Sequence, residues 1–349
     1  MDNSNADNPQ MVLDPQVYNA NWLDLKYMPN LSGHPEIHTC YFNNNEIHVI
    51  CPDLFPPNVK EVNFYNNSLH ADGLPLRWSD TLETIILDRN QITTTNTVPE
   101  WSASLQMFSI DDNPLIEVPE RLPPNLTLLS MSYCHVTNLI NLPTNLKRLR
   151  AYYNKINTIG KLPQTLEYIH LAYNQIQSSV LLRHKLPPTL RFLNLDCNKL
   201  TSLPATLPET LETLSVMGNM ITVLPTRLPT SLRTLIANKN RIKIFKPSWK
   251  PGQRLFQLHI RDNCLIDNLI ELKEQGIIED IFQANNWNQA VHHSYARIIQ
   301  RAFARYKLRK AVRTWARLGY IQRELIDVSY LPELIITYND IESIRLGFL

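Results

Sequence analysis

Hydrophobic residues recur in a fixed order through most of the chain, with a step of 20 to 24 residues between copies. Two copies stand next to each other near the middle of the sequence and share the spacing L-x-x-L-x-L-x-x-N-x-L. They are Leu190, Leu193, Leu195, Asn198 and Leu200, followed by Leu211, Leu214, Val216, Asn219 and Ile221. A repeat of this period indicates a stack of similar coils, and it has to be interpreted before any single helix or strand.

Eleven copies can be followed by the polar residue that ends each one, which is Asn45, Asn67, Asn90, Asn113, Cys134, Asn154, Asn174, Asn198, Asn219, Asn240 and Asn263. The L-x-L core alternates with the period of a strand, so its apolar side chains point into the coil and the intervening ones point out. We expect one short strand per coil and a parallel sheet across the coils. The terminal Asn amide should bond backbone groups that the turn leaves unpaired.

The other half of each coil carries a second motif, L-P-x-x-L, as at 122–126 and 186–190. Proline lacks a backbone N–H and interrupts helices, so this half of the coil should be mostly non-helical. The predicted fold is therefore a repeat solenoid with a concave parallel β-sheet and a mostly non-helical convex side. A helical segment should follow it at the C-terminal end.

Together the two motifs resemble the short leucine-rich repeats of secreted bacterial effectors of the YopM and IpaH kind, and repeats of amoebal and giant-virus proteins. The resemblance covers residues 37–266 and implies a surface for protein recognition. The ubiquitin-ligase members of that group have a separate C-terminal catalytic domain with a Cys-x-Asp motif. Here Cys51-Pro52-Asp53 matches that motif but falls in the first coil. We therefore do not expect ligase activity.

The sequence outside the repeats divides into four further segments. Residues 1–36 are expected to form an N-terminal cap or lead-in to the solenoid 37–266, since a first coil has no neighbour on one side. Residues 267–290 are predicted as a C-terminal cap helix, 291–318 as a basic helix, and 319–349 as an apolar tail.

The segment 291–318 places apolar residues at helical spacing among many Lys and Arg residues. It resembles the IQ motif of calmodulin-binding proteins. Ile299, Gln300 and Arg309 match the motif, Phe303 and Tyr306 are frequent at their places, and Ala304-Arg305 stands in place of the central Arg-Gly. Three interpretations stay open: a solvated cap on the last coil, a site for calmodulin or another EF-hand protein, and a site for anionic lipid or nucleic acid. Nucleic acid is the less favoured partner.

The outward strand positions are the candidate binding surface, because aromatic and arginine residues dominate binding hot spots. Such side chains gather in successive coils at Tyr133, Arg148, Arg150, Tyr152, Tyr153, Tyr168, His170 and Tyr173. Three of the tyrosines occupy one column directly before the Asn position. The alternative interpretation is that stacked tyrosines only cover the sheet.

Composition indicates the cellular compartment in which the protein is expected. The net charge of +2 predicts no strong overall field, and the five cysteines are odd in number and scattered. The first residues are polar rather than signal-peptide-like, and no run of about 18 apolar residues is present to anchor the chain in a membrane. We therefore expect a reducing, cytoplasmic location, which would be the host cytoplasm for a viral or effector protein.

We expect no catalytic residues, cofactor or metal. The sequence has no glycine-rich phosphate loop or nucleophile elbow, and His34, His38, Cys40, His48 and Cys51 match no zinc-ligand spacing. The predicted function is non-enzymatic protein recognition through the concave face, with the basic helix as a second attachment site. The alternative is the substrate-recognition part of a ubiquitin-ligase-type effector or adaptor.

Overall fold

The computed structural model describes residues 14–96, 100–183, 185–243, 245, 255, 257–260 and 262–263. The chain divides into two units, and the first comprises residues 1–242 and 246–263. The first unit contains all the strands and helices of the described residues. The predicted helices at 267–290 and 291–318, the tail at 319–349 and the IQ-like residues lie outside the described part of the chain.

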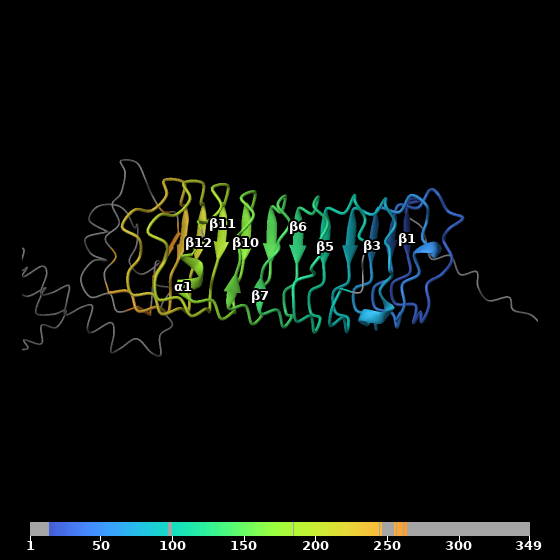
Figure 1. The fold of residues 1–349 in the computed structure, drawn as a ribbon, viewed down its shortest axis with the longest axis horizontal. Helices are drawn as coiled ribbons and strands as arrows, with labels where there is room; N and C mark the ends of the chain where they lie inside the picture. Colours follow the sequence, from blue (N-terminus) through green and yellow to red (C-terminus); the bar gives the residue numbers. More distant parts are fainter. Residues whose placement is uncertain are drawn as a thin grey trace, which may run out of the picture. The chain divides into compact units, whose positions relative to one another are not determined.

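Within the described residues, twelve short strands form one sheet in strict chain order, as Figure 1 shows. The strands are β1 (Val17–Asn19), β2 (Thr39–Tyr41), β3 (Glu61–Asn63), β4 (Thr84–Ile86), β5 (Met107–Ser109), β6 (Leu128–Ser130), β8 (Arg148–Arg150), β10 (Tyr168–His170), β11 (Phe192–Asn194), β12 (Thr213–Ser215), β13 (Thr234–Ile236) and β14 (Gln257–His259). All pairings are parallel, and equivalent residues of successive coils face each other, as Leu193 faces Leu214. The predicted solenoid with a parallel sheet is confirmed.

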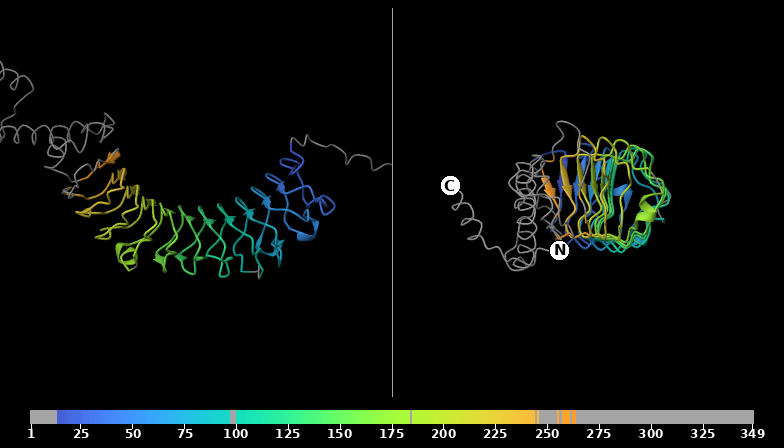
Figure 2. Two further views of the ribbon diagram at one scale, coloured as in Figure 1. Left: turned by 90° about the horizontal axis from the view of Figure 1, so that it is seen from above. Right: turned by 90° about the vertical axis from the view of Figure 1, so that its left-hand side faces the viewer.

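Within this unit the sheet lines the inner side of a curved stack of coils (Figure 2). The inward side chains of the strands form continuous buried columns, including Cys40, Val62, Ile85, Phe108, Leu129, Leu149, Ile169, Leu193, Leu214 and Leu235. Removing each such side chain from water contributes about 1.5–3 kcal/mol, and this burial is the main stabilising term of the unit. The leucine spacing in the sequence therefore marks the core correctly.

The sheet begins one coil earlier than predicted. Strand β1 lies inside the expected lead-in 1–36 and pairs with β2, with Val17 opposite Thr39. Tyr18 and Ala20 stand where later coils have leucine-type residues, and Leu23 stands at the Asn position, so the repeat pattern is not visible there. The backbone N–H of Leu25 nevertheless donates to Asn45 Oδ1 at 3.0 Å, as in the regular coils.

The asparagine column joins neighbouring coils as expected. Asn90 Nδ2 donates to the carbonyl oxygens of Phe64 and Leu87 at 2.9 and 3.0 Å, and Asn90 Oδ1 accepts the backbone N–H of Leu69 at 3.0 Å. The same arrangement recurs at Asn45, Asn67, Asn113, Asn174, Asn198, Asn219 and Asn240. Each amide thus satisfies buried backbone groups of two coils at once.

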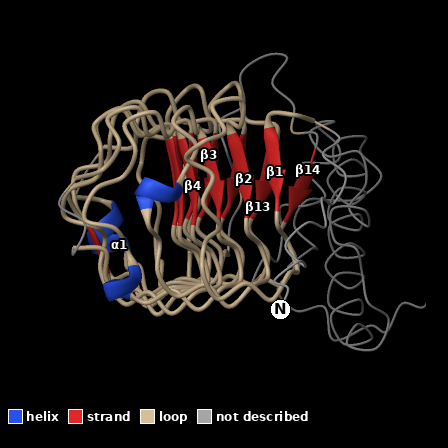
Figure 3. Ribbon diagram, turned by 90° about the vertical axis from the view of Figure 1, so that its right-hand side faces the viewer, coloured by secondary structure: helices blue, strands red, loops and turns tan. Residues whose placement is uncertain are grey.

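The convex side holds only short elements in the described residues: the 3₁₀ turns η1 (Pro52–Leu54) and η2 (Ala71–Gly73), the helix α1 (Ser178–Leu181), and the strand pair β7 (Asn138–Leu139) and β9 (Thr158–Ile159). Figure 3 shows α1 across the coil from the sheet. Within each L-P-x-x-L motif the proline carbonyl accepts the N–H of the second leucine, as from Leu126 to Pro123 at 3.2 Å. The motif is therefore a β-turn, and the mostly non-helical convex side is confirmed.

Candidate functional site

The outward positions of β8, β10 and β11 form the centre of the concave face. Arg148 and Arg150 are exposed and flank the buried Leu149, and Tyr168 faces Arg148 across the β8–β10 pairing. Tyr168 also faces Phe192 of β11 on its other side. The period-two alternation of each strand thus places basic and aromatic side chains together on one surface.

The tyrosine column is a stack of rings. Tyr133 and Tyr153 have ring centroids 4.6 Å apart and planes within 9°, and Tyr153 and Tyr173 lie at 4.1 Å and 8°. Their exposed fractions are 50%, 42% and 41%, so the stack keeps a large solvent-facing surface. Ring pairs of this kind contribute about 0.5–1.5 kcal/mol beyond their area of burial.

A second set of rings extends this stack across the sheet. Tyr152 contacts Tyr133 edge-on at 5.2 Å and stacks on His170 at 4.5 Å, and Tyr168 stacks on Phe192 at 4.4 Å and 5°. His170 and Phe192 meet edge-on at 6.4 Å, and this contact links the Tyr168–Phe192 pair to the other rings. We name the seven connected rings the aromatic cluster: Tyr133, Tyr152, Tyr153, Tyr168, His170, Tyr173 and Phe192.

Phe192 belongs to the aromatic cluster but was absent from the predicted surface. Its signal in the sequence is its place directly before the inward Leu193, the same place that Tyr168 has before Ile169. The other predicted residues of the face are brought together as expected.

The backbone of the tyrosine column is left-handed, with φ of 54° at Tyr133, 54° at Tyr153 and 55° at Tyr173. The same column carries Asn44 and Gly218, residue types that adopt this conformation readily, but also Arg89 and Lys239, which do not. Tyrosine is disfavoured there by about 1–2 kcal/mol, so the backbone does not explain three successive tyrosines. Side-chain stacking and the exposed ring surface are what these residues supply.

The positive charge of this face comes from the two arginines. The Arg150 guanidinium carbon lies 5.7 Å from the centroid of the Tyr168 ring, a cation–π arrangement. Burial, together with the charge of Arg150, lowers the pKa of His170. His170 is therefore neutral near pH 7 and serves as an aromatic ring rather than as a cation.

Carboxylates on the same face are tied into the sheet. Asp88 Oδ1 accepts from Ser109 Oγ at 2.7 Å and from the N–H of Asp111 at 2.8 Å, and Asp196 accepts from Ser215 Oγ at 2.6 Å. Burial raises the pKa of Asp88 to about 6 and also raises that of Asp196. These groups are structural acceptors between coils, with few free lone pairs for a ligand.

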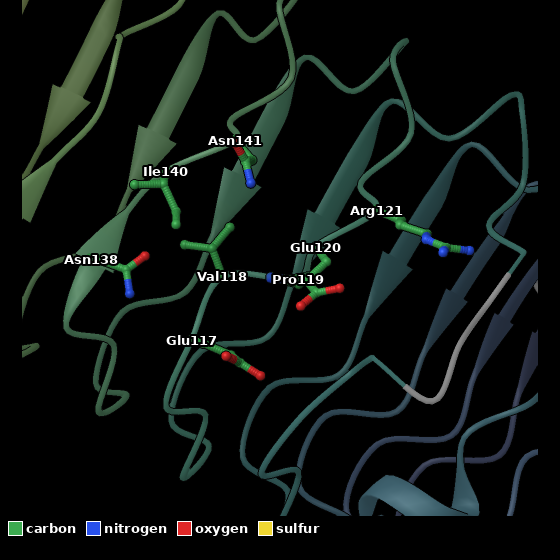
Figure 4. Close-up of a pocket in the computed structure, with 8 residues that line it drawn as sticks. All are labelled: Glu117, Val118, Pro119, Glu120, Arg121, Asn138, Ile140 and Asn141. Atoms are coloured by element: carbon green, nitrogen blue, oxygen red, sulfur yellow. The ribbon is translucent and has the colours of Figure 1, made fainter.

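Two hollows lie outside the aromatic cluster. The first encloses about 280 Å³ near β7 and is lined by Glu117, Val118, Pro119, Glu120, Arg121, Asn138, Ile140 and Asn141 (Figure 4). The second, of about 430 Å³, lies over the first strands of the sheet and is lined by Gln16, His38, Thr39, Lys60, Glu61, Glu83 and Thr84. The cluster itself is an open sheet surface.

The thiol and imidazole groups considered as metal ligands are not gathered into a site. Cys40 is fully buried in an inward strand position, and this burial raises the pKa of its thiol to about 12. Across the described ranges, no three His, Cys, Asp or Glu side chains are placed to hold a metal ion. Cys51 directly precedes the η1 turn, and Asp53 lies within it. In the part of the chain that the structure describes, no helix has the length and hydrophobicity needed to cross a bilayer.

No protein-family model and no curated protein sequence matches the chain. Solved structures do match. YopM from Yersinia enterocolitica WA-314 is 29% identical with a TM-score of 0.60, over 70% of this chain and 50% of that one. The leucine-rich repeat domain of APL1B is 20% identical with a TM-score of 0.60, over 72% and 77% of the two chains. FLRT2, in an octameric complex with Latrophilin 3 and Unc5D, is 22% identical with a TM-score of 0.59, over 75% and 87%.

The fold is a leucine-rich repeat solenoid. Its neighbours are leucine-rich repeat proteins, which typically serve as scaffolds for protein interaction, and they include the effector YopM, as the repeat motifs predict. The chain spans about half the length of the YopM chain that it matches. The leucine-rich repeat fold thus locates the concave face as the surface to consider, and the residues on that face have to supply the argument for function.

Proposed function

We propose that the protein recognises another protein through the concave face of its sheet, with the aromatic cluster at the centre of the contact. The observation that carries the proposal is the continuous packing of seven solvent-accessible rings across four successive coils. Large aromatic side chains and arginine supply most of the energy in protein interfaces. Rings already held by their neighbours lose little side-chain entropy when a partner binds.

The left-handed tyrosine column supports the same proposal. The left-handed position recurs in every regular coil and is also filled by Arg89, Cys197 and Lys239, but the three tyrosines follow one another and stack their rings. Leucine-rich repeat neighbours add further support, since FLRT2 forms a complex with other proteins.

The proposed role is non-enzymatic. Catalytic groups generally work in a water-excluded pocket, whereas the aromatic cluster lies on an open sheet and the carboxylates near it are occupied by hydrogen bonds between coils. Calmodulin or another EF-hand protein stays a predicted second partner for the segment 291–318, and the cytoplasm is the compartment that we propose.

The test uses the full chain in three forms: wild type, Tyr153→Ala, and Val223→Ala as a matched control. Val223 is 60% exposed and lies outside the sheet and the aromatic cluster. Proteins captured from cytosolic extract by the wild type are identified, and the affinity of each purified candidate is measured by calorimetry. We expect Tyr153→Ala to weaken binding by about tenfold or more while Val223→Ala leaves it unchanged. Equal affinity of all three forms for every captured protein would remove the concave face from the interaction.

A further inference from the structure

We propose that Arg148 and Arg150, together with the aromatic cluster, select an acidic protein segment whose carboxylates alternate with aromatic or aliphatic side chains. The proposal rests on the function proposed above and adds the chemistry of the partner. It is carried by two features of the face, unpaired guanidinium groups and an apolar column that crosses them.

The two arginines differ from arginines that lie just outside the strands of the sheet. Arg89 pairs with Asp112 at 3.2 Å, and Arg191 pairs with Glu212 at 2.8 Å, so those charges are neutralised between neighbouring coils. Among the described residues, no carboxylate oxygen lies within 4.0 Å of either Arg148 or Arg150, although both side chains are exposed. Guanidinium groups bind carboxylates through two parallel hydrogen bonds, so these two are available to an acidic ligand.

Their spacing fits an extended peptide. Arg148 and Arg150 are alternate residues of one strand, so their side chains leave the sheet about 6.6 Å apart on the same face. Alternate residues of an extended ligand have the same separation and also share one face. Two alternate carboxylates of such a ligand would therefore meet both guanidinium groups together.

An apolar column runs across the strands through the position of Arg148. In the sheet register, Met107 faces Leu128, Leu128 faces Arg148, Arg148 faces Tyr168, and Tyr168 faces Phe192. The four residues that flank Arg148 in this column are half-buried and apolar or aromatic. A partner that contacted only the two arginines would leave this apolar column exposed to water. We therefore expect the partner to carry apolar side chains that cover the column.

An acidic group that interacts with Arg150 limits the choice of anion. Asp111 interacts electrostatically with Arg150, but its oxygens already accept from Ser130 Oγ at 2.8 Å and from the N–H of Ser132 at 2.5 Å. Asp111 gives one border of the aromatic cluster a negative character, whereas the neighbouring Asp112 is already paired with Arg89. A continuous polyanion such as single-stranded nucleic acid would be repelled there, whereas a short acidic segment can be placed over the arginines alone.

The probes are short synthetic peptides in which Glu, Gln or Lys alternates with Tyr, and a short oligothymidylate. Their binding to the full chain is measured by fluorescence anisotropy for the wild type, the double variant Arg148→Gln/Arg150→Gln, and Arg191→Gln as the control with an already paired arginine. The replaced side chains are exposed, and thermal unfolding checks that each variant is folded. We expect the Glu peptide to bind the wild type about tenfold or more tightly than the Gln peptide, since hydrogen bonds to charged groups exceed neutral ones.

The double variant should lose this preference, and Arg191→Gln should keep it. Equal binding of the Glu and Gln peptides to the wild type would overturn the proposal, and so would an undetectable affinity for the Glu peptide. If Tyr153→Ala still weakens both peptides in the first of these cases, the concave face remains the binding surface and only its charge selection is wrong. Tighter binding of oligothymidylate than of the Glu peptide, lost in the double variant, would assign the face to nucleic acid instead.

Discussion

The rings of Tyr153 and Tyr173 stack at 4.1 Å with planes 8° apart, and both residues have a left-handed backbone with φ of 54° and 55°. Ring stacking stabilises the pair, and the left-handed backbone destabilises it by a similar amount. The column is therefore close to neutral for folding, while it presents a broad aromatic surface to solvent. Substitutions in this column can therefore change the affinity for a partner without a large change in the free energy of unfolding.

This balance predicts an order of stability for two variants of one residue. Tyr153→Asn and Tyr153→Ala both lose the three ring contacts of Tyr153, but only Asn tolerates the left-handed backbone. We expect the Asn variant to be the more stable of the two by about 1 kcal/mol in urea unfolding. An Ala variant as stable as the Asn variant would show that the backbone of this column carries no strain.

The inward positions should respond very differently. Leu193 is 1% exposed at the centre of β11, so Leu193→Ala leaves a cavity in the core and is expected to cost about 2–5 kcal/mol of unfolding free energy. Val223→Ala, at an exposed position, should stay within about 0.5 kcal/mol of the wild type. Similar midpoints for the two variants in chemical denaturation would mean that the strand register is wrong.

Most of the fold could be predicted because each coil repeats the same chemistry. Each position of the motif has the same environment in every coil. The spacing of its residues, such as Leu190, Leu193, Leu195 and Asn198, therefore locates the strand and the turn by itself. Strand β1 was missed since Tyr18 and Leu23 replace the residues that mark the pattern. The position of β1 is set by its pairing with β2, and no motif in the sequence around β1 indicates that pairing.

The sequence also contains a second ladder that the leucine spacing does not reveal. The residue before the second leucine of L-P-x-x-L bonds the previous coil in several repeats, as Thr189 Oγ1 donates to the carbonyl of Leu166 at 2.8 Å. Thr165, Thr210 and Ser231 do the same. The recurrence of small hydroxyl residues at this position was a usable signal. The pairing of each arginine was not, because it depends on which carboxylates the neighbouring coil presents.

The asparagine ladder predicts a hierarchy at one position. Asn198 donates to the carbonyls of Leu171 and Leu195 at 2.9 and 3.1 Å and accepts the N–H of Ile176 at 2.9 Å. Asn198→Ala leaves the N–H of Ile176 without its acceptor, whereas the carbonyl of Leu171 still accepts from Asn174 and that of Leu195 from Asn219. One unsatisfied buried group should cost about 1–3 kcal/mol.

Asn198→Cys should cost less than Asn198→Ala, because the Cys134 thiol in the same column donates to the carbonyl of Ile110 at 3.4 Å. Both variants are compared by urea unfolding. A cysteine variant no more stable than the alanine variant would indicate that the thiol at this position does not replace the amide donor.

Asp88 predicts a dependence of stability on pH. Burial raises the pKa of its carboxyl from 3.8 to about 6, so between these values the folded protein holds a proton that the unfolded chain has released. The corresponding stabilisation is fully present below about pH 4 and is lost as the pH rises through about 6. Asn fits the same position, since Asn21 Oδ1 accepts the N–H of Asn43 at 2.7 Å in the equivalent place of an earlier coil.

Asp88→Asn should therefore remove this pH dependence while keeping the acceptor for Ser109 and for the N–H of Asp111. Between about pH 4 and pH 7 the wild type should lose about 2 kcal/mol of unfolding free energy relative to the variant, because a pKa difference of one unit corresponds to about 1.4 kcal/mol. Urea unfolding of both proteins across this range measures the difference directly. A constant difference would mean that Asp88 stays ionised in the folded protein, and a growing advantage of the wild type would mean that its charged form is the stabilised one.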